Sequence, residues 1–236
     1  LSHDEVVHMK GSLINKMPGT DEEKFAGVRA FYTYMLTHPG KKLLFMGAEF
    51  GQFNEWHFEH SLDWHLLEQE RHQQLQGFFQ SANQFYLAHP ELWELDFSWE
   101  GFQWICADDN QGNCAAFLRK DKKGHFLLTL CNFSPVHRAG YRLGVPCPGR
   151  YEVAFNTDDP AFGGTGLGDL EPLKSEYIPC HGLEQSISVD LPPMGAVILR
   201  CTKKFPPRRK KAELSPAAKP AAKRTSRKKA PAAEES

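Results

Sequence analysis

Apolar residues recur at steps of three and four in two stretches of the first ninety residues, and a proline follows each stretch. The first stretch starts at the pair Thr20 and Glu23, a capping-box signature, and ends at His38-Pro39-Gly40. The second ends at His89-Pro90. The spacing predicts two helices, each with one buried face. These faces comprise Phe25, Val28, Tyr32, Met35 and Leu36 over residues 21–38, and Leu75, Phe78, Phe79, Ala82, Phe85 and Tyr86 in the second stretch.

A short continuous apolar run, Leu43-Leu44-Phe45-Met46, lies between the two helices. Such a run between Gly40 and Gly47 predicts a strand buried on both faces, as in a parallel sheet. The chain opens on Leu1-Ser2-His3-Asp4, which is typical of the exit of another buried strand. Strand end, helix and buried strand make one β/α repeat. The order indicates the last units of a (β/α)8 barrel, where catalytic groups lie at strand exits.

From about residue 92 the pattern changes to short β-branched and aromatic runs separated by turn residues. Two of the turns are Asp109-Asn110-Gln111-Gly112 and Asp121-Lys122-Lys123-Gly124. Seven short strands at this spacing predict an antiparallel sandwich. We expect the strands over residues 102–107, 114–119, 126–133, 140–145, 150–155, 185–190 and 195–201. We expect Trp93, Trp99 and Trp104 to pack beside the sheet rather than to serve as ligand platforms.

The near-neutral total charge hides two regions of opposite sign. Residues 203–236 hold 12 Lys and Arg against 3 acidic residues, whereas the rest of the chain holds 16 basic and 26 acidic residues. The tail has almost no large apolar residue, so burial could not offset the entropy lost on ordering it, and we predict disorder. A contact with DNA or another polyanion is one interpretation of the tail. The other is a solvated tail with no dedicated partner.

Six cysteines, at positions 106, 114, 131, 147, 180 and 201, form no CxxC pair, so the spacing of a metal site is absent. In a chain of this size we expect them to be reduced. No apolar run approaches the roughly 20 residues that cross a bilayer, and no signal-like segment is present. We therefore expect a cytoplasmic protein with no membrane partner.

Several short blocks occur in a fixed order along residues 1–202. They are Ser2-His3-Asp4-Glu5-Val6-Val7-His8, Lys41-Lys42-Leu43-Leu44-Phe45-Met46-Gly47, Glu49-Phe50-Gly51-Gln52, Glu55-Trp56, Ser61-Leu62-Asp63-Trp64, Asn156-Thr157-Asp158, Phe162-Gly163-Gly164 and Leu191-Pro192-Pro193-Met194-Gly195. Together they resemble the C-terminal part of the 1,4-α-glucan (glycogen) branching enzymes of the α-amylase superfamily. The resemblance implies the end of a (β/α)8 TIM barrel over residues 1–90, a β-sandwich domain over residues 91–202 and a tail over residues 203–236.

The resemblance also implies roles for individual residues. In this family the Asp of the final His-Asp block binds hydroxyls of the reacting glucose and stabilises the transition state. Carried over, this gives Asp4 as a catalytic residue with His3 beside it; without the resemblance, Asp4 would be interpreted as capping a polar turn. Glu49, Glu55 and Trp56 match positions near the site, where each either shapes sugar binding or has a structural role.

Met9 departs from the family, in which glycine is common at that position, so the path of the loop after the His-Asp block is in question.

The activity implied is that of a transferase without a cofactor or a metal. The family cuts an α-1,4 glucan, holds the fragment covalently and passes it to a 6-hydroxyl of another chain, with retention. Its nucleophile and general acid/base lie on earlier barrel strands, and no residue of this chain matches them. We therefore expect the isolated chain to be inactive, with an N-terminal barrel portion and an α-glucan as its partners.

Two other interpretations remain open at this point. One is a hydrolase of the same superfamily, such as an amylase or a debranching enzyme, against which the blocks at residues 49–52 and 61–64 favour branching. The other is a non-catalytic glucan-binding module built on the sandwich.

Overall fold

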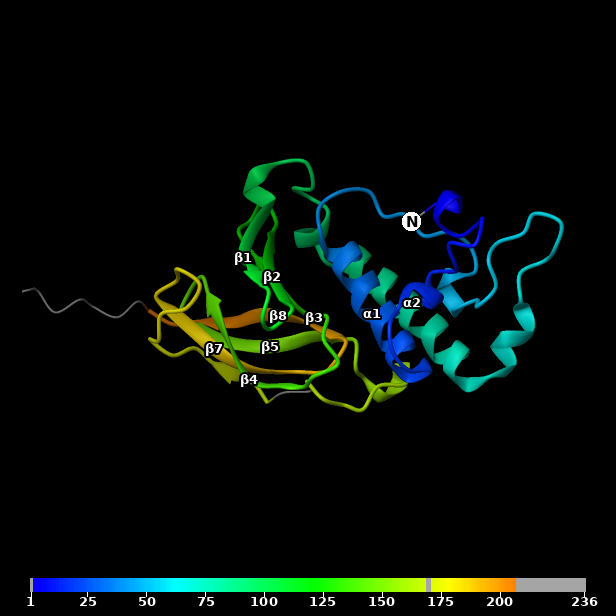
Figure 1. Cartoon of the computed structure of the whole chain (residues 1–236). Coiled ribbons are helices and arrows are strands. Elements are labelled where there is room, and N and C mark those ends of the chain that lie inside the picture. The colour runs from blue at the N-terminus through cyan, green and yellow to red at the C-terminus, as the bar shows by residue number, and fades with distance from the viewer. Residues whose placement is uncertain (1, 169–170, 207–236) are drawn as a thin grey trace, which may run out of the picture. The chain divides into compact units, whose positions relative to one another are not determined.

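Both predicted helices form, and each ends at the residue before its predicted His-Pro stop. Helix α1 spans Asp21–Thr37 and helix α2 spans Glu70–Ala88 (Figure 1). The Thr20 hydroxyl accepts a hydrogen bond from the Glu23 amide at 3.3 Å, and the Glu23 carboxylate accepts one from the Thr20 amide at 2.7 Å. The predicted capping box is therefore confirmed.

The two helices pack through the faces that the apolar spacing predicts. The rings of Tyr32 and Phe79 lie 4.3 Å apart, and the Tyr32 hydroxyl donates to the Asn83 side chain at 2.6 Å. The core of this layer is formed by Leu13, Ile14, Phe25, Val28, Tyr32, Leu36, Leu75, Phe78, Phe79 and Ala82. No helix in the described part of the chain is long and apolar enough to cross a membrane.

The computed structural model describes residues 2–168 and 171–206. Most of the predicted tail, residues 207–236, lies outside the described residues. The predicted disorder and the polyanion contact fall on these residues and stay predictions. Short 3₁₀ helices occupy His3–Glu5 (η1), Ile14–Lys16 (η2), Ala48–Phe50 (η3), Trp64–Glu68 (η4), Pro90–Leu92 (η5), Trp99–Gly101 (η6) and Pro160–Phe162 (η7).

All seven predicted strands are confirmed, and they form two antiparallel layers. The larger sheet has the order β1-β2-β3-β8-β5-β6, and β4 pairs with β7 in the smaller one (Figure 1). The strands are β1 (Phe102–Asp109), β2 (Cys114–Lys120), β3 (Phe126–Asn132), β4 (Arg138–Val145), β5 (Gly149–Asn156), β6 (Leu173–Lys174), β7 (Gln185–Leu191) and β8 (Gly195–Lys204). The two-residue β6 was not predicted, because two residues are too short to show an alternation.

The sandwich core lies between these layers. Side chains such as Leu118 and Leu128 of the larger sheet meet Leu143 and Ile187 of the smaller one, and all four are fully buried. Strand β3 is buried along its whole length, because its other face packs on the helical layer.

The last strand is longer than the predicted range over residues 195–201. Strand β8 continues through Lys204, because Lys203 and Lys204 pair with Arg150 and Gly149 of β5.

The predicted strand over residues 43–46 does not form in the described chain. Leu43 and Met46 are 52% and 51% exposed, and the segment pairs with no strand of the described residues. A strand of a parallel sheet is held by hydrogen bonds to neighbours on each side, and here those neighbours are lacking. The strand exit expected at His3 and Asp4 is likewise a 3₁₀ turn, η1.

The prediction that three tryptophans pack beside the sheet is wrong for Trp99, which is 92% exposed. Trp93 and Trp104 are also exposed over more than 40% of their surface. Trp104 lies on the edge strand β1, and its ring contacts Phe102 at 5.2 Å and Phe117 at 5.6 Å, so only part of it is covered. An edge position leaves one side of a large ring without neighbours.

Arg119 of β2 joins the helical layer to the sandwich. Its buried guanidinium donates to the carbonyls of Thr37 at the end of α1 (2.7 Å), Leu92 (2.8 Å) and Gly101 (3.2 Å). It also forms an ion pair with the Asp96 carboxylate at 2.9 Å. Burial lowers the pKa of Arg119, and Asp96 opposes that shift. The charge is therefore held in the interior by four partners.

Replacing Arg119 by Met should destabilise the chain by about 3–5 kcal/mol, because Asp96 would be left as an uncompensated buried charge. The measurement is urea unfolding followed by circular dichroism. Arg200→Met is the matched control: Arg200 is exposed and lies 3.7 Å from Glu152, and exposed pairs contribute less than about 1 kcal/mol. Equal losses in the two variants would show that Arg119 does not join the two layers.

Candidate functional site

Asp4 and His3 lie together on the surface, at the N-terminal turn η1. The His3 Nε2 atom is 3.0 Å from the Asp4 carboxylate, and both side chains are mostly exposed. The Asp4 carbonyl accepts a hydrogen bond from the Lys10 ammonium at 2.6 Å, which closes the loop back on the turn. The Asp4 carboxylate therefore points away from the core, and an ionised carboxylate in that position can accept hydrogen bonds from sugar hydroxyls.

The N-terminal loop is attached to the segment over residues 45–56, as the prediction of a shared site requires. The Trp56 amide donates to the Val6 carbonyl at 3.1 Å, and the rings of His3 and Phe45 are 6.3 Å apart. Phe45 and Trp56 meet edge to face at 5.5 Å. Asp4 is thus brought to the same side of the molecule as the aromatic residues that follow α1.

Glu55 holds the loop that follows Asp4. Its two carboxylate oxygens accept hydrogen bonds from the backbone amides of Gly11 at 2.6 Å and Met9 at 3.0 Å. These bonds lower the pKa of Glu55, with Gly11 the largest cause. Glu55 thus connects the segment after α1 to the loop that follows Asp4.

Met9 has the backbone conformation that favours glycine. Its φ is +65°, the preceding His8 has φ +59°, and the Met9 side chain is 97% exposed. A side chain in the left-handed region is strained because Cβ crowds the following carbonyl. Met9 keeps this conformation in a loop that Glu55 holds through the Met9 and Gly11 amides.

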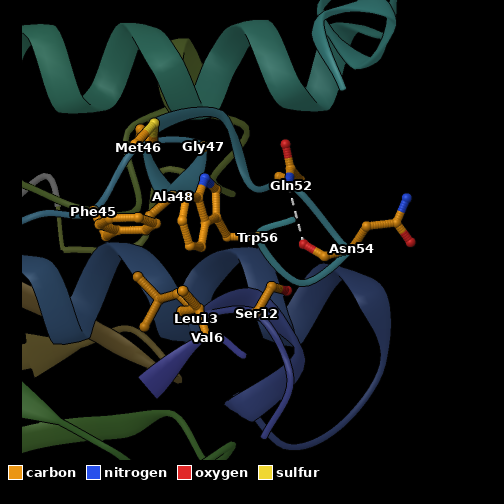
Figure 2. Close-up of a pocket in the computed structure, with 10 residues that line it drawn as sticks. All are labelled: Val6, Ser12, Leu13, Phe45, Met46, Gly47, Ala48, Gln52, Asn54 and Trp56. Atoms are coloured by element: carbon orange, nitrogen blue, oxygen red, sulfur yellow. Dashed lines mark hydrogen bonds between the residues drawn. The ribbon is translucent and has the colours of Figure 1, made fainter. Parts of the chain in front are cut away.

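A small cavity lies beneath the N-terminal loop. It has a volume of about 20 Å³ and is lined by Val6, Ser12, Leu13, Phe45, Met46, Gly47, Ala48, Gln52, Asn54 and Trp56 (Figure 2). Figure 2 shows the rings of Phe45 and Trp56 beside each other at its mouth. Of the predicted site residues only Trp56 lines it; His3, Asp4, Glu49 and Glu55 do not. The cavity is too small for a sugar ring.

A larger hollow of about 300 Å³ opens on the other side of Trp56. Glu55 and Trp56 line it together with Gln52, Asn54, His57, His60, Ser61, Leu62 and Asp63. The rings of His57 and His60 lie 4.8 Å apart there. With its mixture of an indole, imidazoles and amides, this hollow has the polar and stacking groups that bind sugars.

Glu49 lies on η3 and is half-buried, and it lines neither hollow. Sequence reasoning missed Gln52, which organises this region. Its side-chain oxygen accepts from the Asp63 amide at 2.9 Å, and its nitrogen donates to the Asn54 carbonyl at 3.1 Å. The sequence did point to Gln52 as part of the Glu49-Phe50-Gly51-Gln52 block. It could not show which residue of that block holds the loop, because this depends on contacts between residues distant in sequence.

Replacing Met9 by Gly should raise the free energy of unfolding by about 0.5–1 kcal/mol, because relief of the strain exceeds the entropy cost of glycine. Urea unfolding measures it. Asn113→Gly is the matched control: Asn113 has φ +53°, but asparagine tolerates the left-handed region, so no gain is expected. A Met9→Gly variant less stable than the original chain would contradict the assignment of strain to this loop.

Comparison with known proteins gives these segments a context. Residues 104–202 match the family described as the α-amylase C-terminal all-β domain. The 1,4-α-glucan branching enzyme of Aquifex aeolicus is 50% identical over 201 residues, which cover 85% of this chain and 32% of that enzyme. The enzyme of the same name from Aromatoleum aromaticum is 47% identical over 199 residues, 84% of this chain and 31% of that enzyme.

This chain therefore spans about a third of the length of the curated relatives it matches. A solved structure assigned as an α-amylase, from Salmonella typhimurium, is 14% identical with a TM-score of 0.53, over 85% of this chain and 34% of that one. At that identity the likeness supports the fold alone. The resemblance predicted from the sequence blocks is confirmed: over most of its length this chain corresponds to the C-terminal part of the 1,4-α-glucan branching enzymes of the α-amylase superfamily.

Proposed function

We propose that this chain acts as the C-terminal part of a glycogen branching enzyme, in which Asp4 stabilises the transition state. The identity of 50% and 47% to two branching enzymes, over 85% and 84% of this chain, carries the proposal. The exposed Asp4 carboxylate beside the aromatic segment over residues 45–56 supports it. Branching is favoured over the hydrolase alternative because these relatives are named branching enzymes.

The chemistry proposed for Asp4 is binding rather than covalent attack. A retaining reaction uses one carboxylate as nucleophile and a second as acid/base, through an oxocarbenium-like transition state. A third carboxylate helps when its hydrogen bonds to sugar hydroxyls become stronger in that state than in the ground state. Asp4 can accept two hydroxyls at once, and His3 at 3.0 Å fixes its orientation. Neither Asp4 nor His3 requires a cofactor in these roles.

The proposed domain organisation follows from the same comparison. We assign residues 1–90 to the end of a (β/α)8 barrel, with α1 and α2 as its last helices, and residues 91–202 to the sandwich. In the complete barrel the segment over residues 43–46 would pair with neighbouring strands, which would cover Leu43 and Met46. The exposed state of these two side chains supports this assignment. The N-terminal barrel portion is thus the proposed protein partner.

The other predicted residues receive different roles. Trp56, which lines the 300 Å³ hollow, is proposed to stack on the α-glucan. Glu55 acts indirectly by holding the loop after Asp4, and Glu49 is proposed to act where the rest of the barrel would close over η3. The cytoplasm is the proposed location, supported by six cysteines that are all free thiols.

The isolated chain should produce no new α-1,6 linkages when incubated with amylose, because it has one of the three carboxylates.

In the intact enzyme Asp4→Ala should reduce kcat on the order of a hundredfold, the scale for losing one preorganised transition-state contact. Glu5→Ala is the matched control, since Glu5 lies on the same turn and pairs only with Lys10, at 3.8 Å. Branching by the isolated chain, or equal turnover in the two variants, would refute these roles.

A second candidate function, glucan binding by the sandwich, is favoured by one observation. An aromatic hollow of about 470 Å³ lies beside the edge strand β1, lined by His38, Pro39, Asp96, Phe97, Ser98, Trp99, Phe102 and Trp104. Exposed indole rings are typical of a sugar-binding surface. We propose that this hollow binds an α-glucan chain outside the catalytic site.

Native gels cast with glycogen should retard the chain, and Trp99→Ala with Trp104→Ala should abolish the retardation. Tyr177→Ala is the control, because Tyr177 is an exposed aromatic residue of the sandwich that lies outside the hollow. Equal retardation of all variants would show that the hollow does not bind glucan.

A further inference from the structure

Three side chains of the kinds that bind metals converge at the turn between β2 and β3. Asp121 begins this turn, His125 ends it, and Glu91 lies opposite on η5. One ligand atom of each residue lies within 4.8 Å of the other two. The cluster is distant in sequence from the His-Asp block, and neither the proposed catalytic chemistry nor the aromatic hollow uses it.

Asp121 divides its two oxygens between the turn and the cluster. Its Oδ1 atom accepts hydrogen bonds from the backbone amides of Lys123 at 2.9 Å and His125 at 2.7 Å. Its Oδ2 atom lies 2.7 Å from His125 Nδ1. The Asp121 side chain is only 2% exposed, whereas that of His125 is 66% exposed. The turn thus fixes one carboxylate oxygen toward the cluster and leaves the imidazole open to solvent.

Glu91 supplies an unsatisfied oxygen. Its Oε2 atom is buried and has no hydrogen-bond partner within the described residues. The ammonium of Lys122 pairs with Glu94, at 3.9 Å from its carboxylate. The Lys122 amide also donates to that carboxylate, at 2.9 Å. A buried carboxylate oxygen without a partner is costly. A bound cation would remove this cost.

We propose that Glu91 Oε2, Asp121 Oδ2 and His125 Nδ1 bind one divalent cation of the Zn²⁺ class, with water as the fourth ligand. A mixed set of imidazole and carboxylates suits Zn²⁺, whereas Mg²⁺ and Ca²⁺ prefer oxygen ligands alone. The ligand is the neutral imidazole with its one proton on the exposed Nε2 atom, so that the Nδ1 lone pair faces the cation and any proton on Nδ1 is released to solvent on binding. Bonds of about 2.0–2.2 Å require the Asp121–His125 contact to open by several tenths of an ångström, which the exposed imidazole permits.

The cation would link two parts of the fold that Arg119 also joins. Glu91 is next to Leu92, whose carbonyl accepts from Arg119, and Asp121 follows β2 directly. Binding would therefore attach the β2–β3 turn to the connection between α2 and the sandwich. The expected result of binding is greater stability of the connection rather than a change in chemistry.

Isothermal titration of the metal-stripped full chain with ZnCl₂ tests the proposal, with thermal unfolding measured on the same samples. We expect one high-affinity site and a rise in Tm, and MgCl₂ should give neither. His125→Ala and Glu91→Gln should each weaken Zn²⁺ binding at least tenfold and remove the rise in Tm. Glu91→Gln keeps the shape of the side chain, and without metal its Tm should stay close to that of the original chain.

The matched control is the double variant His57→Ala, His60→Ala, which removes the close histidine pair of the hollow beside Trp56. It should bind Zn²⁺ as the original chain does. Loss of binding in this control, or unchanged binding in both His125→Ala and Glu91→Gln, would overturn the assignment. Absence of Zn²⁺ binding would also overturn it.

Discussion

The ion pair between Arg119 and Asp96 is the interaction on which the rest of this structure depends. A guanidinium with no exposure to solvent is stable only when its donors all find acceptors, and Arg119 takes its acceptors from α1, the connection after α2 and η6. Arg29 makes a second such contact, because its Nε atom donates to the Thr157 carbonyl at 2.8 Å. Burial lowers the pKa of Arg29 to about 10, and Asp158 opposes the shift. Two buried arginines thus join the helical layer to the sandwich.

This junction explains how the candidate site keeps its form. With α1 and α2 held on the larger sheet, the chain before α1 and the segment after it are brought together, and backbone contacts such as Val6 to Trp56 follow. Glu55 then holds the loop that leads away from Asp4. The carboxylate is placed at the surface by a series of contacts that begins in the interior. The site is open on one side, because the segment over residues 43–46 pairs with no strand of the described residues.

The features that the sequence predicts well depend on neighbours along the chain. The capping box at Thr20, the helix end before Pro39 and the seven strands are each determined by residues within one turn or one hairpin. The failures depend on distant contacts. A buried strand over residues 43–46 requires partners on both sides, and the partial exposure of Trp104 depends on its place on the edge strand β1. The same holds for Gln52 and Arg119, whose roles appear only in the folded chain, and for the meeting of Glu91 with Asp121.

The most direct test of the account is a crystal structure of the intact enzyme with a bound malto-oligosaccharide. The account predicts the Asp4 carboxylate within about 2.5–3.0 Å of hydroxyls on the reacting glucose, the range of an O–H···O hydrogen bond, and Trp56 against the same chain. A sugar bound elsewhere in the barrel, with Asp4 facing solvent and contacting no hydroxyl, would contradict it.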